Sequence, residues 1–367
     1  MMKSRERLLT ALHNQRPDRL PCQIHAWLDY HLKTVMGGCS LFEANRRCGF
    51  DHVSYLCPKY EFSAKDQARW QVNRQEFAAD AEGNRAWSEV ITTPEGNLTQ
   101  TGANNAYTAW NIQHLIRSER DFELWDRYCP VPVRVDQSGL VADKEFIKDD
   151  GIIRTFPFSP GQGSPWQSLC CLMGTQEAIM AALDTPEWMH HMLGRILAKT
   201  LHVAGMIGHS AADVIEVGGG AGSSTVISPA MFTEFCLPYD RQQCDAFHAI
   251  GLKVSYHLCG GVMPMLELVK ATGADGLETM TPPSMGGNCD LREASRRVGD
   301  ALFFIGGFDQ NAGLERGTPE VIRKQVFDCF EATKDHAGYI LAPSDQFFIG
   351  SEANLRLLAA TCAECRY

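Results

Sequence analysis

Hydrophobic and polar positions recur with two different periods after residue 150. Short apolar runs alternate there with longer segments in which apolar residues return every three or four positions. The short runs have the length of buried strands, and the longer segments have the period of amphipathic helices. Serial strand–helix units of this kind predict a parallel sheet, either open or closed. The predicted strands are 151–156, 212–217, 252–257, 275–278, 302–306 and 338–342, and the predicted helices are 175–183, 186–206, 229–250, 262–271, 319–335 and 352–366.

The first 150 residues follow a different pattern. Apolar residues at helical spacing predict a helix over 4–14, and residues 22–25 are expected to form the first strand. Between residues 60 and 110, segments of alternating polarity such as 87–91 are separated by turns that contain glycine. This alternation predicts a small β-meander inserted into the fold.

Composition and charge narrow the class of protein. The 367 residues are 44% hydrophobic and 21% charged, which is typical of soluble globular chains and suffices for one large barrel or two average domains. A net charge of -10 without any basic cluster argues against a nucleic-acid partner. We find neither an apolar stretch that could cross a membrane nor the apolar core of a signal peptide. The 14 cysteines are scattered, so we expect reduced thiols and a cytoplasmic protein.

The most informative local motif lies at the end of the predicted strand 252–257. His257 and Cys259 are two residues apart and are followed by two glycines. On an extended strand their side chains project to the same face. An imidazole beside a thiolate forms half of a typical zinc site. The alternative is a core cysteine beside a hydrogen-bonded histidine.

Several motifs, taken in their order along the chain, resemble the uroporphyrinogen decarboxylase superfamily. The resemblance spans nearly the whole sequence, and it implies one TIM-like (β/α)8 barrel domain over residues 1–367 with the β-meander inserted at about 60–110. The motifs are residues 4–9 with 16–21, 228–232 with 237–239, 257–260, 273–276, 306–309 and 352–355.

Residues near the predicted first strand favour one branch of this superfamily. The decarboxylases carry arginines there that hold the carboxylates of the porphyrinogen, whereas this chain has Gln23, His25, Trp27 and Asp29. An acidic chain without that arginine pair is poorly suited to a substrate with many carboxylates. The motif of His257 and Cys259 resembles instead the zinc-dependent methyltransferases that exchange methyl groups with corrinoid proteins.

The resemblance to that branch implies a zinc ion with three protein ligands and one open position. Glu278 ends the next predicted strand and is the expected third ligand beside His257 and Cys259, although it could also be a solvated carboxylate at a strand end. The methyltransferases usually carry a cysteine after the last strand, and Asp345 is the nearest candidate ligand in this chain. This harder set of ligands favours a substrate that offers oxygen to the metal.

The implied activity is transfer of a methyl group between a small O-methyl or N-methyl donor and the corrinoid (cobalamin) of a partner protein, as in a demethylase. Zinc would act as the Lewis acid. Glu216 and Asp345, which follow predicted strands, are the candidate catalytic residues, and an ion pair is the alternative role for Glu216. The candidate substrate-binding residues are His25, Trp27, Gln162 and Asp309, with packing the alternative for the first two and a tight turn for the last.

Two other functions are compatible with the sequence. One is a metal-free lyase that resembles uroporphyrinogen decarboxylase, and the other is a non-catalytic barrel that binds a corrinoid or tetrapyrrole. Metal content separates the methyltransferase from both. If the metal hypothesis is right, Glu216, His257, Glu278 and Asp345 should converge where the strands end, because loops at that edge collect catalytic groups.

Overall fold

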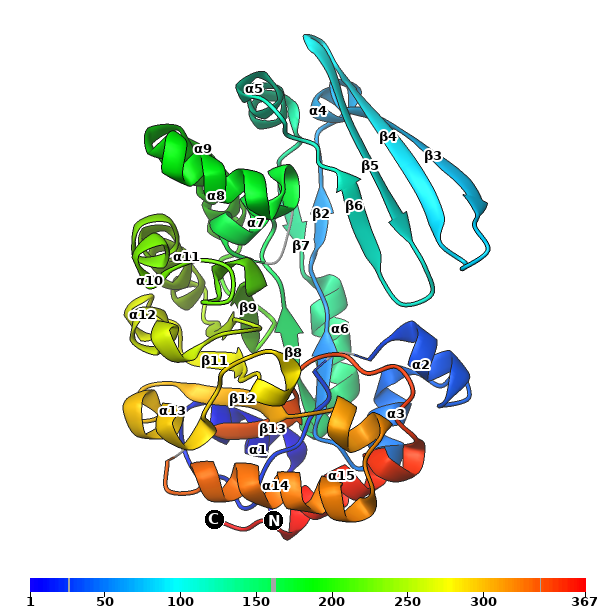
Figure 1. Ribbon diagram of the computed structural model, residues 1–367, viewed down its shortest axis with the longest axis vertical. Coiled ribbons are helices and arrows are strands. Elements are labelled where there is room, and N and C mark those ends of the chain that lie inside the picture. The colour runs from blue at the N-terminus through cyan, green and yellow to red at the C-terminus, as the bar shows by residue number, and fades with distance from the viewer. Residues whose placement is uncertain (26, 160–162, 337) are drawn as a thin grey trace.

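A computed structural model describes residues 1–25, 27–159, 163–336 and 338–367 of the protein (Figure 1). Seven parallel strands form one curled sheet, in the order β1-β8-β9-β10-β11-β12-β13. The six strands predicted after residue 150 are all confirmed within a few residues. The strands are β1 (His52–Tyr55), β8 (Gly151–Thr155), β9 (Val214–Gly218), β10 (Lys253–His257), β11 (Gly276–Thr279), β12 (Phe303–Phe308) and β13 (Tyr339–Pro343).

A short extended segment joins the two edges of this sheet. Cys22 forms an isolated parallel bridge with Leu341 of β13, whose amide donates to Pro21 O at 3.0 Å. On the other side, the Asp51 amide, next to β1, donates to Cys22 O at 2.8 Å. The next donor of the ladder would be residue 343, which is a proline without an N–H, so the pairing stops after one bridge. The predicted strand over 22–25 is therefore wrong, and among the described residues this sheet consists of seven strands and a bridge in place of a regular eight-stranded barrel.

Helices follow most strands and cover the outer face of the sheet (Figure 1), as expected for βα units. The predicted helix 229–250 is split by a π-helical turn, and two helices after residue 150, Pro165–Met173 and Leu291–Val298, were not predicted. Among the described residues no helix has both the length and the apolar character needed to span a bilayer. These helices are α6 (Ser138–Ile147), α7 (Pro165–Met173), α8 (Thr175–Asp184), α9 (Pro186–Gly205), α10 (Pro229–Met231), α11 (Leu237–Ala249), α12 (Leu266–Ala271), α13 (Leu291–Val298), α14 (Pro319–Thr333) and α15 (Glu352–Glu364).

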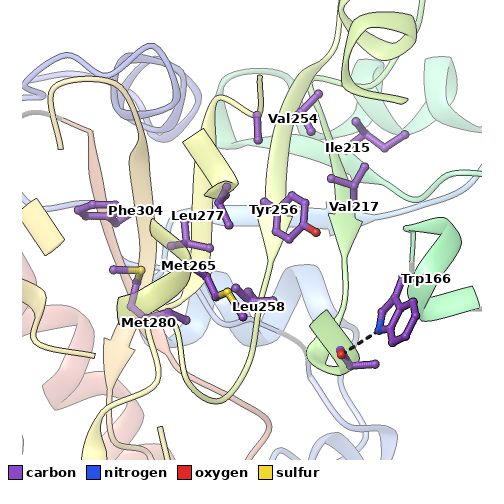
Figure 2. Close-up of a cluster of buried hydrophobic side chains, with 14 of the residues drawn as sticks. Trp166, Ile215, Val217, Val254, Tyr256, Leu258, Met265, Leu277, Met280 and Phe304 are labelled. Atoms are coloured by element: carbon purple, nitrogen blue, oxygen red, sulfur yellow. Dashed lines mark hydrogen bonds between the residues drawn. The ribbon is translucent and has the colours of Figure 1, made fainter. Parts of the chain in front are cut away.

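Two apolar clusters hold the sheet in place. The larger lies between the sheet and the outer helices and includes Val254, Tyr256 and Leu258 of β10 and the residues after it (Figure 2). In the same view, Trp166 Nε1 of α7 donates to Ala221 O at 2.9 Å and so fixes the glycine-rich loop after β9. The smaller cluster fills the inner side of the sheet near the start of its strands. It contains Leu8, Ala11 and Leu12 of α1 (Ser4–Leu12) with Val53, Ile152, Val214, Phe303, Ile305, Ile340 and Ala342.

A second, antiparallel sheet of four strands projects away from the first (Figure 1). It occupies the region in which the alternating pattern predicts a meander, and its strands pair in chain order. The elements of this region are β3 (Gln71–Ala79), β4 (Arg85–Thr93), β5 (Gly96–Asn104) and β6 (Ala109–Gln113), flanked by the pair β2 (Lys59–Glu61) and β7 (Arg134–Asp136) and by α4 (Ala64–Ala68) and α5 (Glu119–Tyr128). Two more helices, α2 (Asp29–Thr34) and α3 (Leu41–Cys48), precede β1.

Candidate functional site

Charged side chains interrupt three otherwise apolar strands. They are Arg154 of β8, Glu216 of β9 and Glu278 of β11. Glu216 pairs in register with Ser255 of β10, and Glu278 pairs with His257. Paired residues of neighbouring strands project to the same face, and residues 255 and 257 share a face on β10. These side chains therefore meet on the inner side of the sheet, above the small apolar cluster.

Arg154 is the centre of this group. One of its guanidinium nitrogens, Nη2, forms ion pairs with both Glu216 Oε2 and Glu278 Oε1, and the exposed fractions of the three side chains are only 1%, 3% and 0%. Burial alone would lower the pKa of Arg154, but the two carboxylates outweigh it and hold this pKa well above its usual value. Glu278 is therefore not the solvated carboxylate that the sequence allowed as an alternative. Glu216 does form the ion pair that was the alternative to a catalytic role.

Sequence analysis missed Arg154, although one signal was available. It is the only charged residue in the buried strand Gly151–Thr155. A charge in such a run must find a partner when the strand is buried, because an unpaired buried charge is costly. The two glutamates show the same signal in their own strands.

The His257 imidazole is held through its Nδ1 atom. Nδ1 lies 2.7 Å from Glu278 Oε1 and 3.3 Å from Glu216 Oε1, and Ser255 Oγ donates to Glu278 Oε2 at 3.2 Å. Burial would lower the pKa of His257, but the charge of Glu216, hydrogen bonds with Cys259 and Glu278 and the charge of Glu278 raise it well above its usual value. Because these contacts fix the ring from Nδ1, Nε2 is the nitrogen that can bind a metal or exchange a proton with a substrate.

A second histidine faces the first. The ring centroids of His25 and His257 lie 5.5 Å apart with an interplanar angle of 37°. One potential ligand atom each from His25, His257 and Glu278 lie within 4.8 Å of one another. Desolvation lowers the pKa of His25, which favours the neutral imidazole that metals bind. Two imidazoles and a carboxylate at this spacing could share one metal ion.

Cys259 follows β10 and is half-buried. It approaches the loop after β9 so closely that a Cβ atom on Gly220 would lie 2.6 Å from its Sγ atom. Glycine at 220 thus gives the thiol its place beside His257, with which it hydrogen-bonds. Of the four residues predicted to converge, the structure brings Glu216, His257 and Glu278 together, with Cys259 beside His257, but not Asp345.

The other predicted residues lie elsewhere or have structural contacts. Trp27 Nε1 donates to Asn45 Oδ1 at 2.9 Å, and its ring packs edge-on against Phe347, so it serves packing. Asp309 accepts hydrogen bonds from Ser284 Oγ and the Ala312 amide in the turn after β12. Gln162 lies outside the described residues.

Asp345 is exposed, and the structure does not bring it into the buried cluster. Its carboxylate accepts a hydrogen bond from the Gln346 amide at 2.7 Å. The residue before it, Ser344, is the buried one and accepts a hydrogen bond from the Gly307 amide at 3.1 Å. The alternation of side chains after β13 thus turns position 345 outward.

A cavity of about 410 Å³ lies apart from this cluster. Its walls are mainly apolar and include the aromatic residues Phe62, Trp70, Trp125 and Phe158, beside Lys199 of α9. None of the residues that line it belongs to the cluster around Arg154. We take the cluster as the candidate site, because among the described residues it holds the one group of histidine and carboxylate atoms close enough to share a metal ion.

Comparison with known proteins adds two kinds of relative. The chain is 28% identical over 228 residues to the methylcobamide:CoM methyltransferase MtbA of Methanosarcina acetivorans. This alignment covers 59% of this chain and 62% of that protein. It is 26% identical over 258 residues to the uroporphyrinogen decarboxylase of Pseudomonas putida. This second alignment covers 65% of this chain and 66% of the relative. In both alignments the chain spans less than two thirds of the relative's length.

A solved methyltransferase structure from Methanosarcina mazei shares the fold, with a TM-score of 0.63 at 15% identity and 99% coverage of both chains. The sequence model of the uroporphyrinogen decarboxylase (URO-D) family matches residues 141–364, which is more than half of the chain and includes β8 to β13. The family resemblance seen in the sequence motifs is thereby confirmed. The chain belongs to the uroporphyrinogen decarboxylase (URO-D) family.

Proposed function

We propose that the protein is a zinc-dependent methyltransferase that moves a methyl group between a small O-methyl or N-methyl donor and the corrinoid of a partner protein. The observation that carries the proposal is the pair His257 and Cys259 at the end of β10, held against two buried carboxylates. The similarity to MtbA, whose name describes a methylcobamide-dependent methyl transfer, supports this branch of the family.

The residues present fit a zinc ion. Imidazole, thiolate and carboxylate are the ligands that zinc takes in catalytic sites, with one position left open. His257, Cys259 and Glu278 would hold the metal. A metal-binding histidine usually has its other ring nitrogen fixed by a carboxylate, and Glu216 Oε1, 3.3 Å from His257 Nδ1, would fill that role when Glu278 binds the ion. When bound, the zinc would supply Lewis acidity toward the heteroatom that carries the methyl group.

The chain's own residues orient this site. Arg154 holds the Glu216 and Glu278 carboxylates in place, and these hold the His257 ring by Nδ1. Glu216 contacts both Arg154 and His257. We therefore assign it the role of orienting His257, in place of the proton transfer that its position at a strand end suggested.

The main competing function is a metal-free lyase of the decarboxylase kind, which the similarity to uroporphyrinogen decarboxylases keeps in view. Such an enzyme would use a cation to bind the carboxylate of its substrate. Arg154 already neutralises two carboxylates of the protein itself, and this weighs against the lyase.

The deciding experiment compares metal content and methyl transfer in wild-type protein and two cysteine variants. We expect about one zinc per chain and methylation of a reduced corrinoid protein by a methylated donor, followed by the absorption change of the corrinoid. Cys259→Ala should lose both, because it removes a zinc ligand. Cys39→Ala, which changes another half-buried cysteine, should keep both.

Circular dichroism serves as the folding control for these variants. Absence of zinc in wild-type protein grown with added zinc, or unchanged zinc in Cys259→Ala, would reject the proposal. The protein would then be better interpreted as a metal-free member of the family.

A further inference from the structure

We propose that His25 is a further ligand of the metal at this site, so that the ion joins the N-terminal segment to β10 and β11. This inference rests on the proposed zinc site and extends it, since the sequence assigned His25 to substrate binding. The metal would then have two imidazoles that lie far apart in the sequence.

The first support is distance. Potential ligand atoms of His25, His257 and Glu278 lie within 4.8 Å of one another. Two ligands that are each about 2.1 Å from a tetrahedral zinc ion lie roughly 3.4 Å apart. Closing the cluster around one ion therefore needs movements of about 1 Å, which rotation about side-chain bonds provides.

The second support is the state of the His25 ring. Among the described parts of the chain, no group forms a hydrogen bond with either of its ring nitrogens, although the ring faces His257 at 5.5 Å. Around it stand Arg154, Glu216 and Glu278, all buried. His25 itself is half-buried, and its ring nitrogens, which have no hydrogen-bond partner among the described residues, are available to a metal ion.

The third support is the placement of the backbone. Cys22 and Gln23 are fixed between the two edges of the sheet by the bridge to Leu341 and by the Gln23 amide, which donates to Leu341 O at 3.0 Å. His25 lies two residues after Gln23. The contacts that close the sheet therefore also place the His25 side chain on the inner face, opposite His257. A ligand held in this way needs little ordering when the metal binds.

The test is metal binding by the full chain, with Co²⁺ as a spectroscopic probe and Zn²⁺ in competition. His25→Ala should weaken the affinity for both ions at least tenfold, because even partners outside the ligand shell contribute that much. It should also change the visible absorption bands of bound Co²⁺, which report the number of ligands. Trp27→Phe, on the same segment, should change neither and serves as the matched control.

His25→Cys provides a second variant that restores a ligand. It should retain tight Co²⁺ binding and gain near-ultraviolet absorption from an additional thiolate, even if His25→Ala does not fold. Wild-type affinity within twofold and an unchanged Co²⁺ spectrum in His25→Ala, or no added thiolate absorption in His25→Cys, would overturn the role of His25 while leaving the proposed function intact. A wild-type protein that binds neither ion would instead reject the proposed function, and the role of His25 with it.

Discussion

Replacement of Arg154 by methionine would leave two carboxylates on the inner side of the sheet without their counter-charge. Glu216 is 3% exposed and Glu278 is fully buried, so water cannot take the place of the guanidinium. Methionine has a similar length and no charge, and it therefore tests the ion pairs with little change in packing.

The expected loss of stability is large. Removal of one partner from a buried ion pair costs about 3–5 kcal/mol, and because one guanidinium here serves two carboxylates we expect about 5 kcal/mol. Unfolding entropy of about 2.1 cal/mol/K per residue gives roughly 0.8 kcal/mol/K for 367 residues, so the melting temperature should fall by about 6 °C.

Thermal and urea unfolding at pH 7 measure this loss. Arg134→Met breaks an ion pair with Glu61 in which both side chains are more than half exposed, and it should change stability by less than about 0.5 kcal/mol. Neutralising both glutamates as glutamine in the Arg154→Met background should recover most of the stability, because no buried charge is then left unpaired. A change of less than about 1 kcal/mol in Arg154→Met alone would refute the reasoning.

Two further predictions concern an acid and a glycine. Burial raises the pKa of Asp240 to about 7, and Tyr256 OH donates to its Oδ2 atom at 2.5 Å. Because the folded state holds this proton more tightly than the unfolded state, stability should fall as pH rises from about 4 to 7, and Asp240→Asn should remove that decline and add up to about 4 kcal/mol at pH 8. Urea unfolding between pH 4 and 8 measures this, and identical pH profiles would contradict it. Gly220→Ala would bring a methyl group within 2.6 Å of Cys259 Sγ and should lower zinc affinity about tenfold in calorimetry, whereas Gly222→Ala, with its nearest neighbour at 3.5 Å, should bind zinc normally.

The six parallel strands after residue 150 could be predicted from the sequence because each is a short, mainly apolar run bounded by glycine or a polar turn, whereas β1 (His52–Tyr55) has no such run and was not predicted. The same logic placed His257 at the end of β10, next to Glu278 of the following strand. Both residues are found by reading one strand and its successor, so no long-range information was needed.

What the sequence could not supply are contacts between distant strands. Arg154 shows itself only as a lone charge, and its partners become visible only when β8, β9 and β11 curl around one interior. Residues 22–25 look like a strand by their apolar pattern, but the proline at 343 removes the donor that would extend the pairing. The position of His25 depends on that closure, and local patterns carry no trace of it.

The bridge between Cys22 and Leu341 also sets an order of events during synthesis. These two residues are separated by most of the chain, and contacts of such long range form late, because the intervening loop must first be closed. A growing polypeptide leaves the ribosome amino end first, so the segment around Cys22 can pair with Asp51 early but lacks its second neighbour until β13 has emerged. The cluster around His257 can therefore take its final form only when the chain is nearly finished, and truncation before β13 would leave the His25 side without a fixed position.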